Sequence, residues 1–560
     1  MKKFVVFILF FVFVGNSSAL GATDNFGNQI PENYLPFSFS AGSFAPDPNF
    51  SVMPKKYSGV YPVASTLPIC KSVSDTDCIV NVEYIDSGGN VLPGKFQGYV
   101  PVSYKGPCTS TNDAEGYKEL CQSTEPYFTY DTSEISYPAQ INRKIPKSSR
   151  GSIWVFPGME SNGERKYLVS FKVWGEMTNH NSPLAEDSYA DWNTGGAGAY
   201  IVPISISNGG NGETLNSDNR SLFKTSNQSC YPNSSPESIY CLTKITDESS
   251  PRFRLTVRLE LTSSFLLNRN WQISKTLDPT ITSKIAGKIT TLTYSGNMTK
   301  VWSATALIPK TLSGYKLFID ATNQSYKDSG VTNKPLDSND LSGFENWLKI
   351  GSAGTNGSDP SAIGFFSGIS DKVEIRSAKV DYVWMFESAN VSGTDVGWLW
   401  PCAKTPQLSG VTSSNATILR PTPPKWNSVD STLEFKIGSP HFDEKNTVIS
   451  GFYNITVSEE VAKCLWGVQA TLASAKVSII SDSGEKKLTT FVTNKKDGYI
   501  NFQVNGFDYS VNTIKISLDK VQASKIPKNS SLGSITCINN KKVIRVIKAG
   551  QKCPSGFKKK

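Results

Sequence analysis

The sequence contains only two histidines, His180 and His441, among its 560 residues. A Ser-His-Asp or Cys-His catalytic site would have to use one of them, and no G-x-S-x-G motif is present to position a nucleophilic serine. The sequence also lacks H-E-x-x-H, C-x-x-C and G-x-x-x-x-G-K-[ST] motifs. We therefore predict no catalytic residues, no metal site and no cofactor. We interpret His441 as a structural residue beside Pro440, and His180 as a loop residue.

Long apolar segments are missing after residue 14, so we predict no transmembrane segment in the mature chain. At the N-terminus, Lys2 and Lys3 precede the apolar run Phe4–Val14, and small residues follow it. This pattern is typical of a secretory signal peptide. We assign residues 1–22 to it, with cleavage between 19 and 22. A membrane anchor is the alternative, but spanning a bilayer takes about 20 apolar residues.

The ten cysteines are even in number, which favours disulfides in an exported chain. We pair them by proximity along the sequence, and the true connectivity stays open. The predicted pairs are Cys70–Cys78, Cys108–Cys121, Cys230–Cys241, Cys402–Cys464 and Cys537–Cys553.

Basic residues are concentrated at the C-terminus. The chain has a formal charge of +9; eight basic residues and no acidic one lie after Cys537, and Lys2 and Lys3 add two more, which leaves the rest at −1. Such a cluster attracts an anionic polymer, although lysines can also merely keep a chain end soluble. The candidate envelope-binding residues are Lys541, Lys542, Arg545, Lys548, Lys552, Lys558, Lys559 and Lys560.

Alternating apolar and polar residues dominate the rest of the chain and predict antiparallel β-strands. The clearest example is 253–261, and 167–173 and 514–518 follow the same pattern. Residues 500–504 follow Asp497-Gly498, which predicts a hairpin. One short helix is expected near 338–349, where Leu341, Phe344 and Trp347 share a face; its N-cap is Ser342, or else Asp337 or Ser338.

We therefore predict an all-β protein with several immunoglobulin-like β-sandwich domains in series. The expected divisions are an N-terminal β domain, a sandwich, a β domain with the helix, a C-terminal immunoglobulin-like sandwich, a linker and a basic hairpin tail. The tail strands 534–538 and 542–547 would meet at Asn539-Asn540, stapled by a disulfide. The boundaries, in that order, are 23–150, 151–290, 291–400, 401–522, 523–534 and 535–560.

Several short sequences resemble uncharacterised exported proteins of actinobacteria, especially freshwater planktonic ones. The tail carries the most specific of them, and the segment before it and two N-terminal stretches carry the others. The resemblance implies a cell-surface location and immunoglobulin-like sandwiches, and it implies no catalytic residues. The matching residues are Cys537, Lys541-Lys542 and 552–560; Ser439-Pro440-His441-Phe442, Gly451-x-Tyr453 and 461–465; and Asp77-Cys78, 82–84 and 154–158.

A few further residues could contact ligands. Trp398 and Trp400 would share one face of a strand, either packed in a core or exposed to stack on sugars. Glu186, Asp187, Asp191 and Trp192 are either a solvated loop or part of a glycosidase cleft. Asp482, Ser483 and Glu485 form a hairpin turn or contribute to a calcium site. N-x-[ST] sequences at Asn297, Asn415 and Asn454 arise by chance or accept glycans.

We therefore expect a secreted, non-enzymatic protein of the cell envelope, surface or wall. Its β domains would act as spacers or as modules for adhesion or interaction, and its basic tail would bind an anionic envelope polymer. Glycans are a possible second partner, and nucleic acid is not expected. The alternative is a secreted carbohydrate-binding protein or glycoside hydrolase, and a third option is a eukaryotic glycoprotein.

Overall fold

The computed structural model describes most of the chain as an all-β body with four helices in the described ranges. The predicted all-β class is thus confirmed. The structure describes 23–41, 60–100, 146–157, 165–178, 193–209, 222–225, 228–232, 239–245, 249–261, 271–329, 337, 353–356, 362–389, 396–405, 407–467, 475–481, 484, 486–487, 490–509, 512–518, 534–539, 544–548, 555 and 557–559.

The first sandwich packs two antiparallel sheets face to face. In one sheet the order is β4–β3–β12–β15–β14, and in the other β5–β6–β7–β8, with β2 also paired to β7. Their bounds are β2 Val60–Thr66, β3 Cys78–Ile85, β4 Val91–Pro93, β5 Lys95–Tyr99, β6 Ser152–Val155, β7 Lys166–Thr178, β8 Asn193–Gly209, β12 Arg252–Leu259, β14 Thr276–Ala286 and β15 Ile289–Pro309.

The core of this sandwich forms because each sheet has one continuous apolar face. Tyr167, Val169 and Phe171 from β7 pack in one cluster with Phe253 and Leu255 from β12. The Phe253 ring lies 5.1 Å from that of Tyr167. The strict alternation of buried residues along β12 confirms the strand predicted there.

Three further strands extend the β8 sheet. β11 (Ile239–Lys244) pairs with the end of β8, β10 (Gln228–Pro232) pairs with β11, and β9 (Leu222–Thr225) pairs with β10. All of these pairs are antiparallel, and β11 rather than β9 lies beside β8, so the chain reaches the outer strand β9 first and returns toward β8 through β10 and β11.

The second sandwich is built from 410–518 together with strand β13. One sheet has the order β13–β18–β22–β26–β25, and the facing sheet has β19–β21–β27–β23–β24, with β20 beside β21. Their bounds are β13 Trp271–Ser274, β18 Gly410–Ser414, β19 Ile418–Leu419, β20 Lys425–Asn427, β21 Thr432–Gly438, β22 Ser450–Ser458, β23 Ala475–Ser481, β24 Lys486–Lys487, β25 Thr490–Lys496, β26 Tyr499–Asp508 and β27 Asn512–Leu518.

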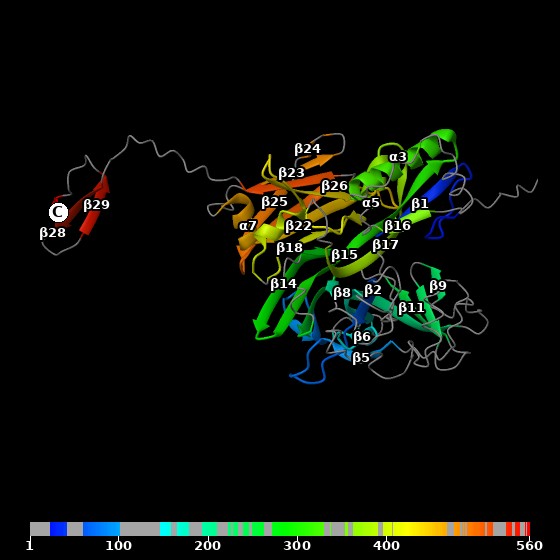
Figure 1. Cartoon of the computed structure of the whole chain (residues 1–560), viewed down its shortest axis with the longest axis horizontal. Helices are drawn as coiled ribbons and strands as arrows, with labels where there is room; N and C mark the ends of the chain where they lie inside the picture. Colours follow the sequence, from blue (N-terminus) through cyan, green and yellow to red (C-terminus); the bar gives the residue numbers. More distant parts are fainter. Residues whose placement is uncertain are drawn as a thin grey trace, which may run out of the picture.

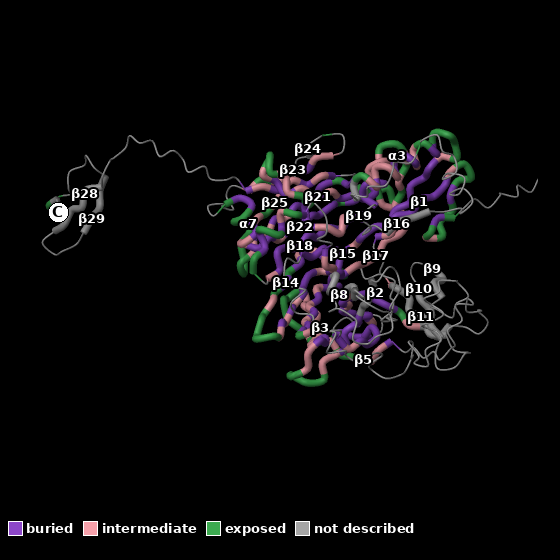
Figure 2. Tube along the Cα trace, in the orientation of Figure 1, coloured by how far each residue is buried: buried purple, intermediate pink, exposed green. Residues whose placement is uncertain are grey.

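The predicted hairpin at Asp497-Gly498 is confirmed as the β25–β26 turn. Lys496 pairs with Tyr499, and both loop residues have positive φ, 52° and 81°. A two-residue loop with this backbone matches the twist of the strands it joins. Ile455 of β22 and Phe502 of β26 then face Phe435 and Ile514 across the second core, which is buried throughout its centre (Figure 2).

A layer of two helices covers a third sheet, β16–β1–β15–β17. These elements are β1 Tyr34–Ser40, β16 Ala353–Asn356, β17 Ile375–Ser388, α3 Leu312–Ser329 and α5 Ala362–Ile369, and Figure 1 shows the helices over β1 and β16. Gly364 and Gly368 let α5 approach α3 closely: a Cβ at Gly368 would lie 2.7 Å from Ala321 Cα. Small residues four positions apart form the contact on both helices.

Two long strands join these layers. The first half of β15 pairs with β12 and β14, and its second half pairs with β1 and β17. Strand β17 in turn pairs with β8 of the first sandwich and β13 of the second. Strands from the two sides of each predicted boundary, at 150, 290 and 400, are therefore hydrogen-bonded to one another. The pairing describes sheets that share strands rather than separate sandwiches in series.

The helix expected near 338–349 lies outside the described residues, so it stays a prediction. The expectation of only one helix is wrong, because the described residues contain α3, α5, α6 (Leu399–Cys402) and α7 (Glu459–Trp466). Helix α3 begins after Thr311, whose Oγ1 accepts a hydrogen bond from Gly314 N at 3.2 Å. Buried Tyr315 and Ile319 follow at helical spacing.

Replacing Gly368 with leucine is expected to destabilise the body. The new side chain would meet the α3 backbone at Ala321, and overpacking of this kind costs about 1–3 kcal/mol. Chemical denaturation of G368L and wild type measures the loss in free energy of unfolding. The matched control is K316L on the exposed side of α3; equal losses in both variants would contradict the close packing described here.

Candidate functional site

The C-terminal tail forms a small sheet of its own. β28 (Ser534–Asn539) pairs with β29 (Ile544–Lys548) on one side and β30 (Phe557–Lys559) on the other, and no strand is shared with the two larger sheets. The predicted hairpin is thus extended by a third strand. Because Ile538 pairs with Ile544 and Asn539 belongs to β28, the register does not fit a two-residue turn at Asn539-Asn540.

The register brings basic residues together on this tail sheet. Arg545 and Lys559 both lie opposite Cys537, on its two sides, and Lys558 lies opposite Ile538. Lys548 lies opposite Ser534 at the other end of the sheet. The remaining candidates, Lys541, Lys542, Lys552 and Lys560, lie outside the described residues.

Two of the predicted disulfides are present in the described residues. Cys70–Cys78 closes a short loop, and Cys402–Cys464 joins α6 to α7. Cys230 lies directly opposite Cys241 on β10 and β11. Cys108, Cys121 and Cys553 lie outside the described residues, so those pairings stay predictions.

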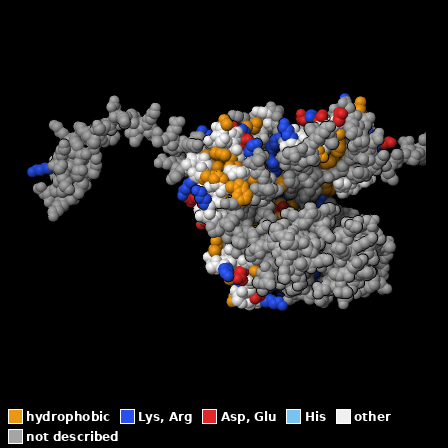
Figure 3. All heavy atoms as spheres, in the orientation of Figure 1, with side chains coloured by type: hydrophobic (Ala, Val, Ile, Leu, Met, Phe, Trp, Pro, Cys, Tyr) orange, Lys and Arg blue, Asp and Glu red, His pale blue; other side chains and the backbone are white. Residues whose placement is uncertain are grey.

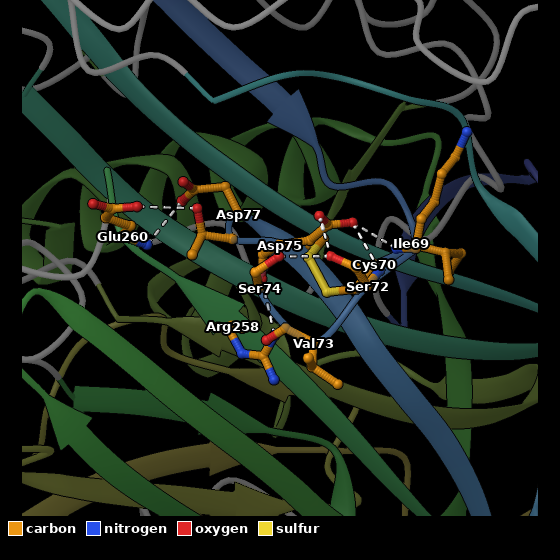
Figure 4. Close-up of a disulfide and its surroundings, with 12 residues drawn as sticks. Ile69, Cys70, Ser72, Val73, Ser74, Asp75, Asp77, Arg258 and Glu260 are labelled. Atoms are coloured by element: carbon orange, nitrogen blue, oxygen red, sulfur yellow. Dashed lines mark hydrogen bonds between the residues drawn. A yellow bond between two sulfur atoms is a disulfide. The ribbon is translucent and has the colours of Figure 1, made fainter.

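The Cys70–Cys78 loop is held by hydrogen bonds on every side (Figure 4). Asp75 accepts from Lys71 N at 2.7 Å and from Ser72 Oγ at 2.7 Å, and these bonds lower the pKa of Asp75. Arg258 Nη1 donates to Val73 O at 2.5 Å. The loop therefore has a fixed shape, with the Val73 side chain 93% exposed.

Helix α6 places two tryptophans differently from the sequence prediction. The segment is a helical turn rather than a strand, so Trp398 and Trp400 do not share one sheet face. The Trp398 ring packs on the buried Trp271 ring at 6.0 Å, and its Nε1 donates to Pro424 O at 3.0 Å. Trp400 is 46% exposed.

The chain after α6 is fixed by Glu460 of α7. This carboxylate accepts from Lys404 N at 3.1 Å and from Thr405 Oγ1 at 2.5 Å. Burial alone would raise the pKa of Glu460, but the hydrogen bonds from Thr405 and Lys404 outweigh it and lower the pKa. With Cys402–Cys464 alongside, the C-terminal end of α6 is fixed to α7.

Among the other candidate residues, His441 has a structural role, and most of the rest lie outside the described residues. His441 Nδ1 lies 2.6 Å from Tyr509 O, a structural contact. Gly484 N donates to Ser481 O, and β23 pairs with β24 in antiparallel fashion. Outside the described residues are His180, Glu186, Asp187, Asp191, Trp192, Asp482, Ser483 and Glu485.

Two of the N-x-[ST] asparagines are buried in the folded chain. Asn415 is 6% exposed, and its Nδ2 donates to Ser450 O at 3.1 Å. Asn454 is 1% exposed. Neither amide is accessible to a glycan-transferring enzyme after folding, whereas Asn297 is partly exposed on β15.

The sequence reasoning missed a buried lysine where the layers meet. Lys275 lies between β13 and β14 with none of its surface exposed. Its Nζ donates to Ala41 O and, at 3.0 Å, to Thr417 O. Burial lowers the pKa of Lys275 to about 7, while Glu387 and Asp381 partly oppose the shift.

A second polar joint lies nearby on β8 and β17. Tyr200 Oη donates to Glu387 Oε1, and the neighbouring Ser388 Oγ accepts from Ala197 N at 2.9 Å and from Gln272 Nε2 at 3.0 Å. Burial raises the pKa of both Tyr200 and Glu387. These contacts tie β8, β13 and β17 together.

The described residues contain no group of three or more His, Cys, Asp or Glu side chains arranged to hold a metal ion. In the same part of the chain, no helix is both long and apolar enough to cross a bilayer. No known protein-family model matches the sequence. No curated protein matches it either.

The stability of the body is expected to depend on pH through Lys275. Its pKa is about 7 when folded and 10.5 when exposed, so the unfolded chain binds more protons between these values and stability rises with pH. Replacing Lys275 with methionine removes this contribution. Urea denaturation at intervals from pH 6 to about pH 9.5 should therefore show a smaller rise in K275M than in wild type.

The control for this measurement is K316M, which removes an exposed lysine from α3. It should keep the slope of the wild type. Equal slopes in K275M and wild type would show that Lys275 titrates as it does in the unfolded chain.

Proposed function

We propose that this is an exported, non-enzymatic protein of the cell envelope, held there by electrostatic attraction between its tail sheet and an anionic surface polymer. The observation that carries the proposal is the concentration of eight basic residues after Cys537, on a chain whose remainder has a formal charge of −1 apart from Lys2 and Lys3. A near-neutral body and a basic end divide the chain into two electrostatic parts.

The tail sheet supports this role because it brings separate basic segments together. Arg545 and Lys559 lie on the two strands that flank β28, both opposite Cys537. Two strand spacings separate their backbones by about 10 Å. The Debye length at physiological salt is about 8 Å, so the two charges are largely screened from each other, and a polyanion has to lie against the sheet to interact with both.

The body suits a spacer or interaction module. Its sheets share the strands β15 and β17, so a load on one layer passes through backbone hydrogen bonds to the next. The body's small net charge gives it little attraction of its own for the anionic polymer. Attachment is therefore assigned to the tail.

The test compares two triple variants in cells that export the protein. Lys558, Lys559 and Lys560 are changed to glutamine in one, and Lys310, Lys316 and Lys327, all exposed in the body, are changed in the other. Both lose three charges, but only the tail variant should move from the envelope to the medium. Immunoblots of the two fractions measure the distribution.

Salt provides a second readout of the same attachment. Raising NaCl to about 1 M shortens the Debye length to about 3 Å and should elute the wild type from isolated envelopes. Retention of the tail variant at the wild-type level, or resistance of the wild type to salt, would contradict electrostatic attachment.

A further inference from the structure

We propose that one end of the first sandwich binds the surface of an anionic lipid bilayer, with Val73 and Ile285 entering the headgroup layer and nearby lysines contacting lipid phosphates. This surface, the sandwich tip, consists of the Cys70–Cys78 loop and the end of the β14–β15 hairpin. The inference goes beyond the proposed function and concerns a different part of the molecule from the tail.

The register of one sheet places the loop and the hairpin at the same end. Arg258, near the end of β12, pairs with Cys78 of β3 on one side and with Thr291 of β15 on the other. Thr291 pairs in turn with Lys284, near the end of β14. The Arg258 side chain also donates to Val73 O. Two strand spacings, about 10 Å, separate β12 from β14, so the loop that β12 holds stands beside the hairpin.

Each part of the sandwich tip exposes one aliphatic side chain. Val73 is 93% exposed, and Figure 4 shows its side chain pointing away from the disulfide. Ile285 is 52% exposed, one residue before the end of β14. Neither residue belongs to the buried cluster of the first core. Apolar side chains that stand out from a folded surface in this way can enter the boundary between lipid headgroups and acyl chains.

Both parts have a fixed backbone before any contact with lipid. The loop is closed by the Cys70–Cys78 disulfide and by the hydrogen bonds to Asp75. The hairpin has a two-residue loop, since Ala286 pairs with Ile289 and Gly287 has a positive φ of 62°. The two aliphatic side chains are therefore presented without further ordering, which reduces the entropy lost on binding.

Charge favours an anionic bilayer. Lys284 and Lys288, both exposed, flank Ile285 on the hairpin. The sequence has no acidic residue from 279 to 319, and on the loop Lys71 is also exposed. Lysines beside an apolar tip are attracted to anionic headgroups. The acidic residues of the neighbouring loop and strand accept hydrogen bonds from that loop and strand themselves: Asp75, Asp77 and Glu260.

The sandwich tip stands out from the body. Figure 1 shows the free end of β14 projecting on the side away from α3, and in Figure 3 hydrophobic, basic and acidic side chains lie together at this lower-left end of the body. Reversible contact through a few aliphatic side chains needs a second, electrostatic contribution to hold a protein at a bilayer. The lysines of the hairpin supply that contribution here.

The experiment measures co-sedimentation of the full exported chain with vesicles of phosphatidylcholine, with and without phosphatidylglycerol. Every sample carries K558Q/K559Q/K560Q, so that the contribution of the tail is lowered equally. V73S/I285S should bind vesicles that contain phosphatidylglycerol about tenfold more weakly than this parent. The matched control is V429S/V492S, whose side chains are 92% and 52% exposed elsewhere on the body, and it should bind like the parent.

Two further comparisons separate the charges from the insertion. K284Q/K288Q should also weaken binding, whereas K316Q/K327Q, which removes two exposed lysines from α3, should not. Insertion is measured with I285W, whose fluorescence brominated lipids should quench beyond the quenching seen in the parent. V492W should add no such quenching, because β25 lies away from the sandwich tip.

Circular dichroism and melting curves check that each variant is folded. Equal binding by V73S/I285S and its parent, or equal binding to vesicles without phosphatidylglycerol, would overturn the proposal. Absence of vesicle binding would overturn it in favour of a protein partner for the sandwich tip. The attachment of the tail is tested with other variants, in cells and isolated envelopes, so the two proposals fail separately.

Discussion

Backbone hydrogen bonding along β15 and β17 is the constraint on which the rest of the body depends. Each strand is hydrogen-bonded in one sheet over part of its length and in another sheet over the remainder. A slip of one residue in either strand would turn that strand's buried residues to the opposite face in both sheets to which it belongs. The two sandwiches and the α3–α5 layer are therefore arranged by shared strands, and the side-chain cores complete an arrangement that the pairing already defines.

Polar contacts reinforce these junctions. Lys275 links its own strands to Ala41 and Thr417, and the Tyr200–Glu387 contact closes the β8–β17 pair. Buried polar groups of this kind are costly unless satisfied, so each one favours a single arrangement of the layers. The positive and negative charges of the body nearly balance, and the net positive charge of the chain comes from the tail, whose sheet shares no strand with the body.

Local patterns predicted local structure well. The alternation in β12, the Asp497-Gly498 hairpin and the Cys70–Cys78 disulfide all depend on residues close together in the sequence. The pairing of β3 with β12 could not be predicted in this way, because 167 to 180 residues separate the partners.

Helix α5 was missed because Gly364 and Gly368 weaken its helical propensity, and only contact with α3 explains these two glycines. The sequence around Lys275 gave no sign that this lysine is buried, because a lysine between Ser274 and Thr276 resembles part of a solvated turn. Trp398 and Trp400 alternate as in a strand, but Cys402–Cys464 holds a helical turn there.

Native-state hydrogen exchange is the most direct test of the shared-strand account. Amides of β15 in its first half, beside β12, and in its second half, beside β1, should exchange with the same free energy of opening and respond to denaturant together. Strands of the two sandwiches should unfold in the same cooperative step. Separate opening of the two halves of β15, with one sandwich unfolding while the other stays protected, would contradict the claim that shared strands hold the body together.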